Sequence, residues 1–116
     1  MLFSSELIKG TLKTIILKML SEHKRMYGYE ITQAVKEKTG DKIRIGEGAL
    51  YPSLHSLEAE GLLITETEYI GKRLRIYYSL SKEGKAKSKE KVKEFNEFVS
   101  TMNHLLDTKT KHALQS

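Results

Sequence analysis

GALYPSLHSLE, at residues 48–58, is the stretch of sequence on which the fold of this chain depends. Its apolar residues recur at the spacing of one helix face, as Leu50, Leu54 and Leu57. Pro52 is the only proline in the chain, and proline is tolerated in the first turn of a helix but not in its interior. The helix is therefore expected to begin just upstream, near Glu47 or Gly48, and to end at Gly61 with a Schellman-type cap.

The side of this helix opposite the leucines is left for solvent or for a ligand. At 100° per residue that side carries small or hydrogen-bonding residues, namely Ala49, Pro52, His55, Ser56 and Ala59. Such residues let a helix approach base edges closely in a DNA major groove. His55 is either a DNA contact or a solvated side chain. Tyr51, about 100° from the leucine stripe, either packs half-buried or presents its hydroxyl to a phosphate.

Two further helices are expected upstream of this stretch. Residues 6–20 form an amphipathic helix with a wide apolar face, in which Gly10 indicates either a late start or a closely packed neighbour. Residues 21–26 are polar and predict a connection. A second helix runs from about Gly28 to Lys38 and stops at Gly40, where a left-handed residue is favoured. Ile43 and Ile45 then alternate with basic residues and predict an extended link or a small strand.

Downstream of the helix the hydrophobic period changes to two. Apolar or aromatic residues alternate with polar and basic ones, as Leu74, Ile76, Tyr78 and Leu80 against Arg73, Arg75, Tyr77 and Ser79. Two antiparallel strands that turn near Gly71 and Lys72 account for this pattern. Tyr77 and Tyr78 are expected to pack on the sheet rather than to stack on bases. Lys72, Arg73 and Arg75 either solubilise the hairpin or contact phosphates and the minor groove.

Ser81 is expected to cap a last long helix, with Glu83 in its first turn. This helix carries an apolar seam at steps of three and four, made of Val92, Phe95, Val99, Met102 and Leu106, with Phe98 beside it. A chain of 116 residues has a thin core. The seam is therefore predicted to contact a second copy of the chain; the alternative is that it folds back on the first helix of its own chain. The lysine run at residues 85–93 favours a solvated face.

The order helix, helix, helix, hairpin, long helix describes a winged helix-turn-helix, a mainly α fold with a small β-hairpin wing and a long C-terminal helix. Residues 1–80 are expected to form the DNA-binding domain and residues 81–106 a dimerisation helix. Residues 107–116 are polar and are expected to form a disordered tail.

Composition and motifs exclude several classes of protein. With 20 Lys and Arg against 15 Asp and Glu, the net charge of +5 favours polyanionic partners. The absence of cysteine removes disulfides, thiolate nucleophiles and Cys-containing metal sites. No serine elbow or phosphate-binding loop is present, and no two histidines have a metal-binding spacing, so neither an enzyme, nor a cofactor, nor a metal site is expected. No stretch approaches the roughly 18 apolar residues of a membrane span, and a cytoplasmic protein is expected.

Four segments resemble the PadR family of bacterial transcriptional regulators: GTL at residues 10–12, YGYEI at 27–31, GALYPSLHSLEAEGL at 48–62 and KRLRIYYSL at 72–80. The resemblance covers about residues 7–84. It implies a homodimeric winged-helix DNA-binding protein, usually a repressor, that is cytoplasmic and nucleoid-associated when bound to DNA. The C-terminal part is similar to that of the short subfamily, in which a single helix supplies most of the dimer interface.

The chain departs from the family pattern at a few positions. Many members carry a basic residue where this chain has Ser56, and a Pro and a Lys where it has Leu74 and Ile76. These departures shift the expected phosphate contacts to Lys72, Arg73 and Arg75. Some members bind flat hydrophobic compounds in a cleft between the paired C-terminal helices, often through Trp. This chain has no Trp, and the resemblance implies that Phe95 and Phe98 would line such a cleft.

The sequence thus predicts a dimeric, sequence-specific regulator. It is expected to be a repressor that binds a palindromic DNA operator and that a small hydrophobic effector releases from the DNA. The predicted DNA contacts are Tyr29, Ala49, Tyr51, Pro52, Ser53, His55, Ser56, Lys72, Arg73 and Arg75. The predicted dimer contacts are Val92, Phe95, Phe98, Val99, Met102 and Leu106. The alternative is a winged-helix module that binds protein without specific DNA contact; the basic wing tip favours DNA over this alternative.

Overall fold

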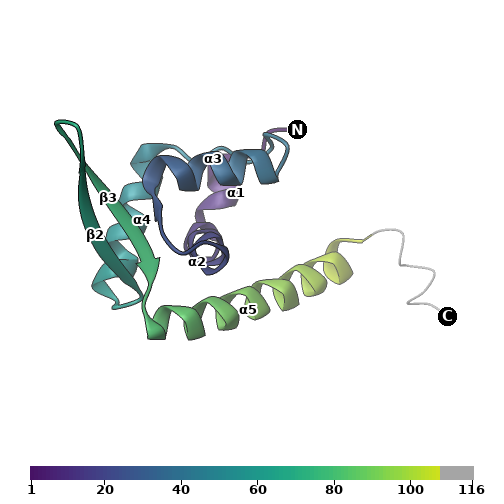
Figure 1. Ribbon diagram of the computed structural model, residues 1–116. Helices are drawn as coiled ribbons and strands as arrows, with labels where there is room; N and C mark the ends of the chain where they lie inside the picture. Colours follow the sequence, from purple (N-terminus) through teal and green to yellow (C-terminus); the bar gives the residue numbers. More distant parts are fainter. Residues whose placement is uncertain (108–116) are drawn as a thin grey trace.

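The computed structural model describes residues 1–107, which form a cluster of short helices, a small sheet on one side and a long helix beneath (Figure 1). The helices are α1 (Ser5–Lys9), α2 (Leu12–Glu22), α3 (Gly28–Lys38), α4 (Glu47–Ala59) and α5 (Lys82–Leu106). The strands are β1 (Met26–Tyr27), β2 (Leu63–Ile70) and β3 (Arg73–Leu80). The predicted winged helix-turn-helix with a long last helix is confirmed. The predicted tail lies, from residue 108 onward, outside the described residues.

The helix expected over residues 6–20 is wrong as a single helix, because it breaks between α1 and α2. The backbone N–H of Thr11 donates to the Ile8 carbonyl at 2.8 Å, and the Thr11 hydroxyl donates to the same oxygen at 2.9 Å. These bonds close a tight turn in place of the next helical turn. A Cβ on Gly10 would meet nothing within 4 Å. Of the two explanations for Gly10, the late start of the main helix is therefore the one observed.

The beginning of α4 at Glu47 agrees with the prediction, but Pro52 is its sixth residue and thus lies beyond the first turn. A proline there cannot donate a hydrogen bond to the carbonyl of Gly48. Gly48 is exposed, so water can reach that carbonyl, which explains why the proline is tolerated.

Left-handed glycines end the elements where the sequence predicted stops. At the end of α4, Gly61 has a φ of 77°, and its N–H donates to the Glu58 carbonyl at 2.9 Å. The N–H of Leu62 donates to the Leu57 carbonyl at 3.0 Å, which completes the Schellman cap. Gly40, with a φ of 58°, follows α3 in the same way.

The sheet has the strand order β1-β3-β2, and both pairings are antiparallel. β2 and β3 form the predicted hairpin, in which Ile70 lies opposite Arg73 and residues 71–72 make the turn. β1 was not predicted, since residues 21–26 were expected to be only a connection. Its two residues, Met26 and Tyr27, pair with Tyr78 and Tyr77. A strand of two residues is too short to show a period.

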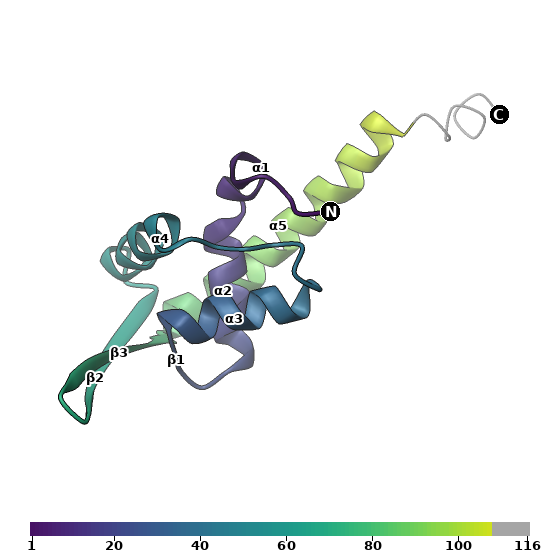
Figure 2. The ribbon, with the colours of Figure 1, turned by 90° about the horizontal axis from the view of Figure 1, so that it is seen from above.

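The core lies between α2, α3, α4 and the inner face of the sheet. Its fully buried large side chains are Ile16, Leu17, Ile31, Leu50, Leu54 and Leu57. α5 is attached beside this core: the Ser81 hydroxyl, which caps the helix, donates to the Gly61 carbonyl at 2.6 Å, and the Ser88 hydroxyl donates to the Leu17 carbonyl at 3.2 Å. Seen from above, the first half of α5 passes under the body and the second half extends beyond it (Figure 2). No helix within residues 1–107 is long and apolar enough to cross a membrane.

Candidate nucleic-acid interface

α4 presents an exposed face of the kind expected of a recognition helix. Ala49, Pro52 and His55 are exposed on it, while Ser53 and Ser56 are half-buried at its edge. The three leucines on the opposite side are buried in the core, so the orientation of the helix is as predicted. From Glu47 to Glu60 the chain carries no Lys or Arg. Any cation on this surface must therefore come from another element.

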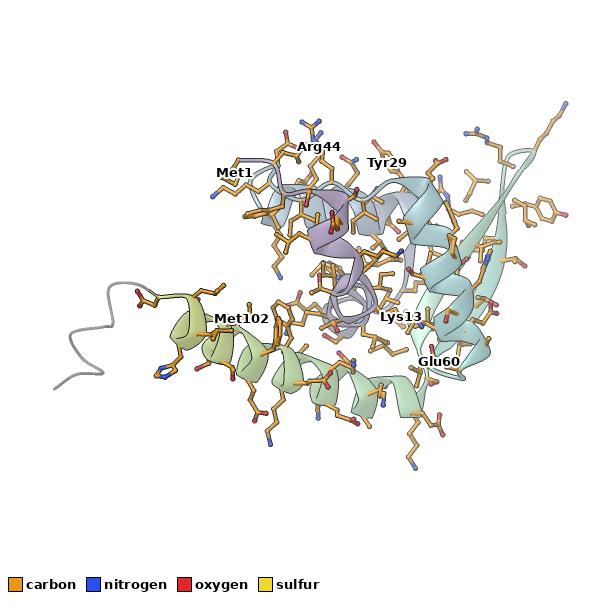
Figure 3. All side chains as sticks on the ribbon, turned by 180° about the vertical axis from the view of Figure 1, so that it is seen from behind. Met1, Lys13, Tyr29, Arg44, Glu60 and Met102 are labelled. Carbon is orange, nitrogen blue, oxygen red and sulfur yellow. The ribbon has the colours of Figure 1, made fainter. Side chains whose placement is uncertain are left out.

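The N-terminus of α3 lies beside α4 and is held there by Tyr51. A Cβ on Gly28, the first residue of α3, would lie 2.6 Å from the Tyr51 hydroxyl oxygen. The Tyr51 side chain is half-exposed, at 37%. The packed arrangement of this side chain is thus observed, and contact with a phosphate stays a prediction. Tyr29, in the first turn of α3, is 63% exposed and lies near the N-terminal end of α4 (Figure 3).

The basic residues of the wing fall into two kinds. The side chains of Lys72 and Arg73 lie exposed at the tip and make no hydrogen bond or ion pair with any other residue among 1–107. Arg75 is half-buried instead, with its guanidinium carbon 4.0 Å from the centre of the Tyr27 ring. Its Nη1 also donates to the Tyr77 hydroxyl at 3.4 Å, and this hydrogen bond raises the pKa of Arg75. The guanidinium group of Arg75 is therefore already engaged by Tyr27 and Tyr77 within the protein.

Arg25 forms the other half of the same arrangement. Its guanidinium carbon lies 3.8 Å from the centre of the Tyr77 ring, and its nitrogens lie 3.0 Å from Glu68 and 3.6 Å from Glu66. The rings of Tyr27 and Tyr77 meet edge to face at 5.6 Å. We call Arg25, Tyr27, Arg75 and Tyr77 the wing-base cluster, because it joins β1 and the segment before it to both strands of the wing.

Sequence reasoning missed Arg25, although a signal was present. The pattern Arg-x-Tyr occurs twice, at residues 25–27 and 75–77. Because Tyr27 pairs with Tyr77 in antiparallel strands, each arginine lies diagonally across the tyrosine of the other strand. The predicted packing of Tyr77 and Tyr78 on the sheet is confirmed. Tyr78 is buried in the core, and this burial raises its pKa.

Lys13 is a second residue that sequence reasoning missed. It lies on α2, and its Nζ donates to the Ser56 hydroxyl at 2.7 Å and to a Glu60 carboxylate oxygen at 3.1 Å. Forty-three residues separate Lys13 from Ser56 in the chain, so only the packing of α2 against α4 brings them together.

The apolar seam of α5 is divided between two environments. Val92 and Phe95 are half-buried and line a cavity of about 410 Å³ together with α2 and α3. Phe98, Val99 and Leu106 are exposed, while Met102 is half-exposed. The seam thus folds back on its own chain in its first half only.

Phe95 and Phe98 are adjacent in space, as the expected cleft requires. Their ring centres are 6.3 Å apart, and both residues line an open groove of about 760 Å³ with residues of α1 and α2. Within one protomer the two rings therefore border a concave apolar surface. Whether an effector binds there stays a prediction.

An exposed recognition helix, a neighbouring helix N-terminus and a hairpin with a basic tip together define a DNA-binding transcriptional regulator of the winged helix-turn-helix class. Comparison with known proteins narrows this class. The model of the transcriptional regulator PadR-like family matches residues 16–90. The chain belongs to this family, whose members are transcriptional regulators and not enzymes.

Individual relatives agree with this assignment. The chain is 36% identical over 96 residues to an uncharacterised protein of Lysinibacillus sphaericus, covering 80% of this chain and 85% of that protein. Its structure is similar to that of a transcriptional regulator from Clostridium thermocellum, with a TM-score of 0.81, 31% identity and coverage of 89% and 100% of the two chains. A PadR family regulator from Eggerthella lenta gives a TM-score of 0.76 at 31% identity, with 89% and 88% covered.

Proposed function

We propose that this regulator acts as a homodimeric repressor that occupies a palindromic DNA operator. In this proposal α4 of each protomer enters the major groove of one half-site, and the wing tips contact the flanking backbone. Binding of this kind blocks transcription by covering the operator. The observation that carries the proposal is the exposed face of α4 with Ala49, Pro52 and His55, which is free of bulky charged side chains.

The dimer is supported by the second half of α5. Phe98, Val99 and Leu106 are exposed on a helix that extends beyond the body of the protomer. A contiguous exposed apolar surface of this kind marks a protein interface. The family typically dimerises. In a symmetric dimer two such helices would cover each other's apolar seam.

Release by a small hydrophobic effector forms part of the proposal. The adjacent rings of Phe95 and Phe98 border an open groove, and pairing of two α5 helices would place a second copy of these rings nearby. Calorimetry with planar cationic and phenolic compounds tests this point. Heat from one compound class, and none from the same compound with Phe98→Ala, would support an effector site.

One observation favours the alternative of a protein-binding module. Tyr69, Leu74 and Ile76 are exposed on one face of the wing, beyond the part that covers the core. An apolar face of this kind suits a protein surface as well as a minor groove. DNA binding and protein binding differ in salt dependence, since only the former releases the counterions condensed on the phosphates.

The test of the main proposal is selection of bound sequences from a random duplex library, followed by footprinting on the selected site. Two inverted half-sites about 10 base pairs apart, or a multiple of that spacing, are expected, with at least about a thousandfold preference over scrambled duplex. A reporter placed behind the site should be silenced when the protein is expressed. Equal affinity for selected and scrambled duplexes would contradict the proposal and favour the protein-binding module.

A further inference from the structure

We infer that the junction of α2 and α4 is a binding site for a DNA phosphate, with Lys13 as its ligand and Glu60 holding Lys13 in the DNA-free protein. The inference rests on the proposed placement of α4 in the major groove. It adds Lys13 of α2 to the DNA interface, and it assigns to Glu60 the role of binding the Lys13 ammonium group when DNA is absent.

The charge of α4 creates the need for such a residue. Between Glu47 and Glu60 the chain has three carboxylates and no Lys or Arg. Phosphates line both walls of the groove that the helix would enter, and neutralising them supplies much of the affinity for DNA. The wing tip provides cations on one side of the helix. On its other side, next to Ser56 and Glu60, the cation in direct contact is Lys13.

The geometry places Lys13 at the surface rather than in the core. Its Nζ lies 2.7 Å from the Ser56 hydroxyl and 3.1 Å from Glu60, and the side chains of Lys13 and Glu60 are 46% and 48% exposed. Both lie beside the C-terminal half of α4, away from Tyr29 at its N-terminal end (Figure 3). Ser56 belongs to the same edge of the helix as Ser53. A phosphate on the wall of the groove could therefore approach Lys13 without any backbone movement.

The contacts of Lys13 allow an exchange of anions. An exposed Lys–Glu pair in water contributes little, because solvent screens it. An ammonium group has three donor hydrogens, so Lys13 can keep the Ser56 hydroxyl while it turns from a carboxylate to a phosphate. Glu60 repels the same phosphate. It therefore opposes DNA binding in two ways, by occupying Lys13 and by its own charge.

The experiment measures affinity and its salt dependence for the full-length chain on the selected operator and on scrambled duplex. Lys13→Met should lower the affinity about tenfold or more on both duplexes and flatten the slope of log affinity against log salt by about 1 per protomer. Lys13→Arg should keep both values. Glu60→Gln should raise the affinity in the parent protein and much less in the Lys13→Met background.

A matched pair on another helix gives the effect of net charge alone. Lys87 and Glu90 form an exposed ion pair at 3.5 Å on α5, so Lys87→Met and Glu90→Gln change the same charges on a helix outside the proposed DNA interface. The inference is overturned if Lys13→Met equals Lys87→Met in affinity and slope, or if Glu60→Gln acts equally in both backgrounds. A parent protein without salt-dependent binding to any duplex would overturn the proposed function as well.

Discussion

Arg73 and Arg75 lie two residues apart on one face of the wing, and their guanidinium groups have different surroundings. Arg73 is exposed at the tip, whereas Arg75 lies over the ring of Tyr27 and bonds to Tyr77. The alternation of side chains along a strand places Arg73 and Arg75 on the same face, but it does not predict which of them contacts other residues of the protein. The phosphate role expected of both from the sequence is therefore better supported for Arg73, and Arg75 is better described as a residue that positions the wing.

This difference leads to a prediction about salt dependence. Arg73→Gln should flatten the slope of log affinity against log salt by about 1 per protomer, because one phosphate contact is lost. Arg75→Gln should leave the slope nearly unchanged and should instead lower the melting temperature, since a cation–π contact is removed. Fluorescence anisotropy from low to high salt measures the first effect and circular dichroism the second. Equal slopes for the two variants would show that both arginines, or neither, contact phosphate.

Gly28 is a residue whose size matters, because the Tyr51 hydroxyl occupies the space of its missing Cβ. Gly28→Ala should displace Tyr51 and weaken operator binding. In a Tyr51→Ala background the same substitution should have little further effect, since the obstacle is gone. Affinities of the parent, the two single variants and the double variant form the required cycle. Strict additivity on a logarithmic scale would argue against the contact.

At the scale of the elements, the packing of α5 against the end of α4 depends on Gly84. A Cβ at this position would clash with the backbone carbonyl of Leu62, which cannot turn aside as a side chain can. Gly84→Ala should therefore destabilise the fold by about 1–3 kcal/mol. Gly10→Ala serves as the control, because a Cβ there meets nothing within 4 Å and its φ is −73°; that substitution should be neutral or should stabilise by up to about 1 kcal/mol. Urea denaturation measures the free energy of unfolding of both variants. A Gly84→Ala variant as stable as the parent would mean that α5 can move to accommodate the added methyl group.

At the scale of the whole molecule, the second half of α5, which extends beyond the other helices (Figure 2), is the surface through which two chains would dimerise. Val99 is on the exposed part of the seam, so Val99→Asp would place a charge in the proposed interface without disturbing the core. We expect the parent chain to sediment at twice 13.3 kDa and this variant as a monomer that binds the operator weakly.

The neighbouring substitution Ser100→Asp adds the same charge on the polar side of the helix and serves as the control. It should leave the dimer intact in analytical ultracentrifugation. A parent protein that sediments as a monomer at micromolar concentration would contradict the role given to this helix.

The sequence by itself determined the order of the elements other than β1, and most of their ends. Helix and strand periods follow from the spacing of apolar residues along the chain, and Gly40, Gly61 and Gly71 marked stops because left-handed backbone favours glycine. Ser81 marked the start of α5 because its hydroxyl caps the helix. These signals are local, so a single chain carries them. The break at Gly10 was a local signal too, but it left two explanations open.

Only the tertiary structure decided which residues far apart in the chain come into contact. The two residues of β1 acquire their role only by pairing with β3, and the wing-base cluster follows from that pairing. Lys13 reaches Ser56 only because α2 packs against α4, and Tyr51 reaches Gly28 only because α4 lies beside α3. Contacts of this kind leave no periodic trace in the sequence. Their energy depends on distances that the fold sets once all the helices have packed.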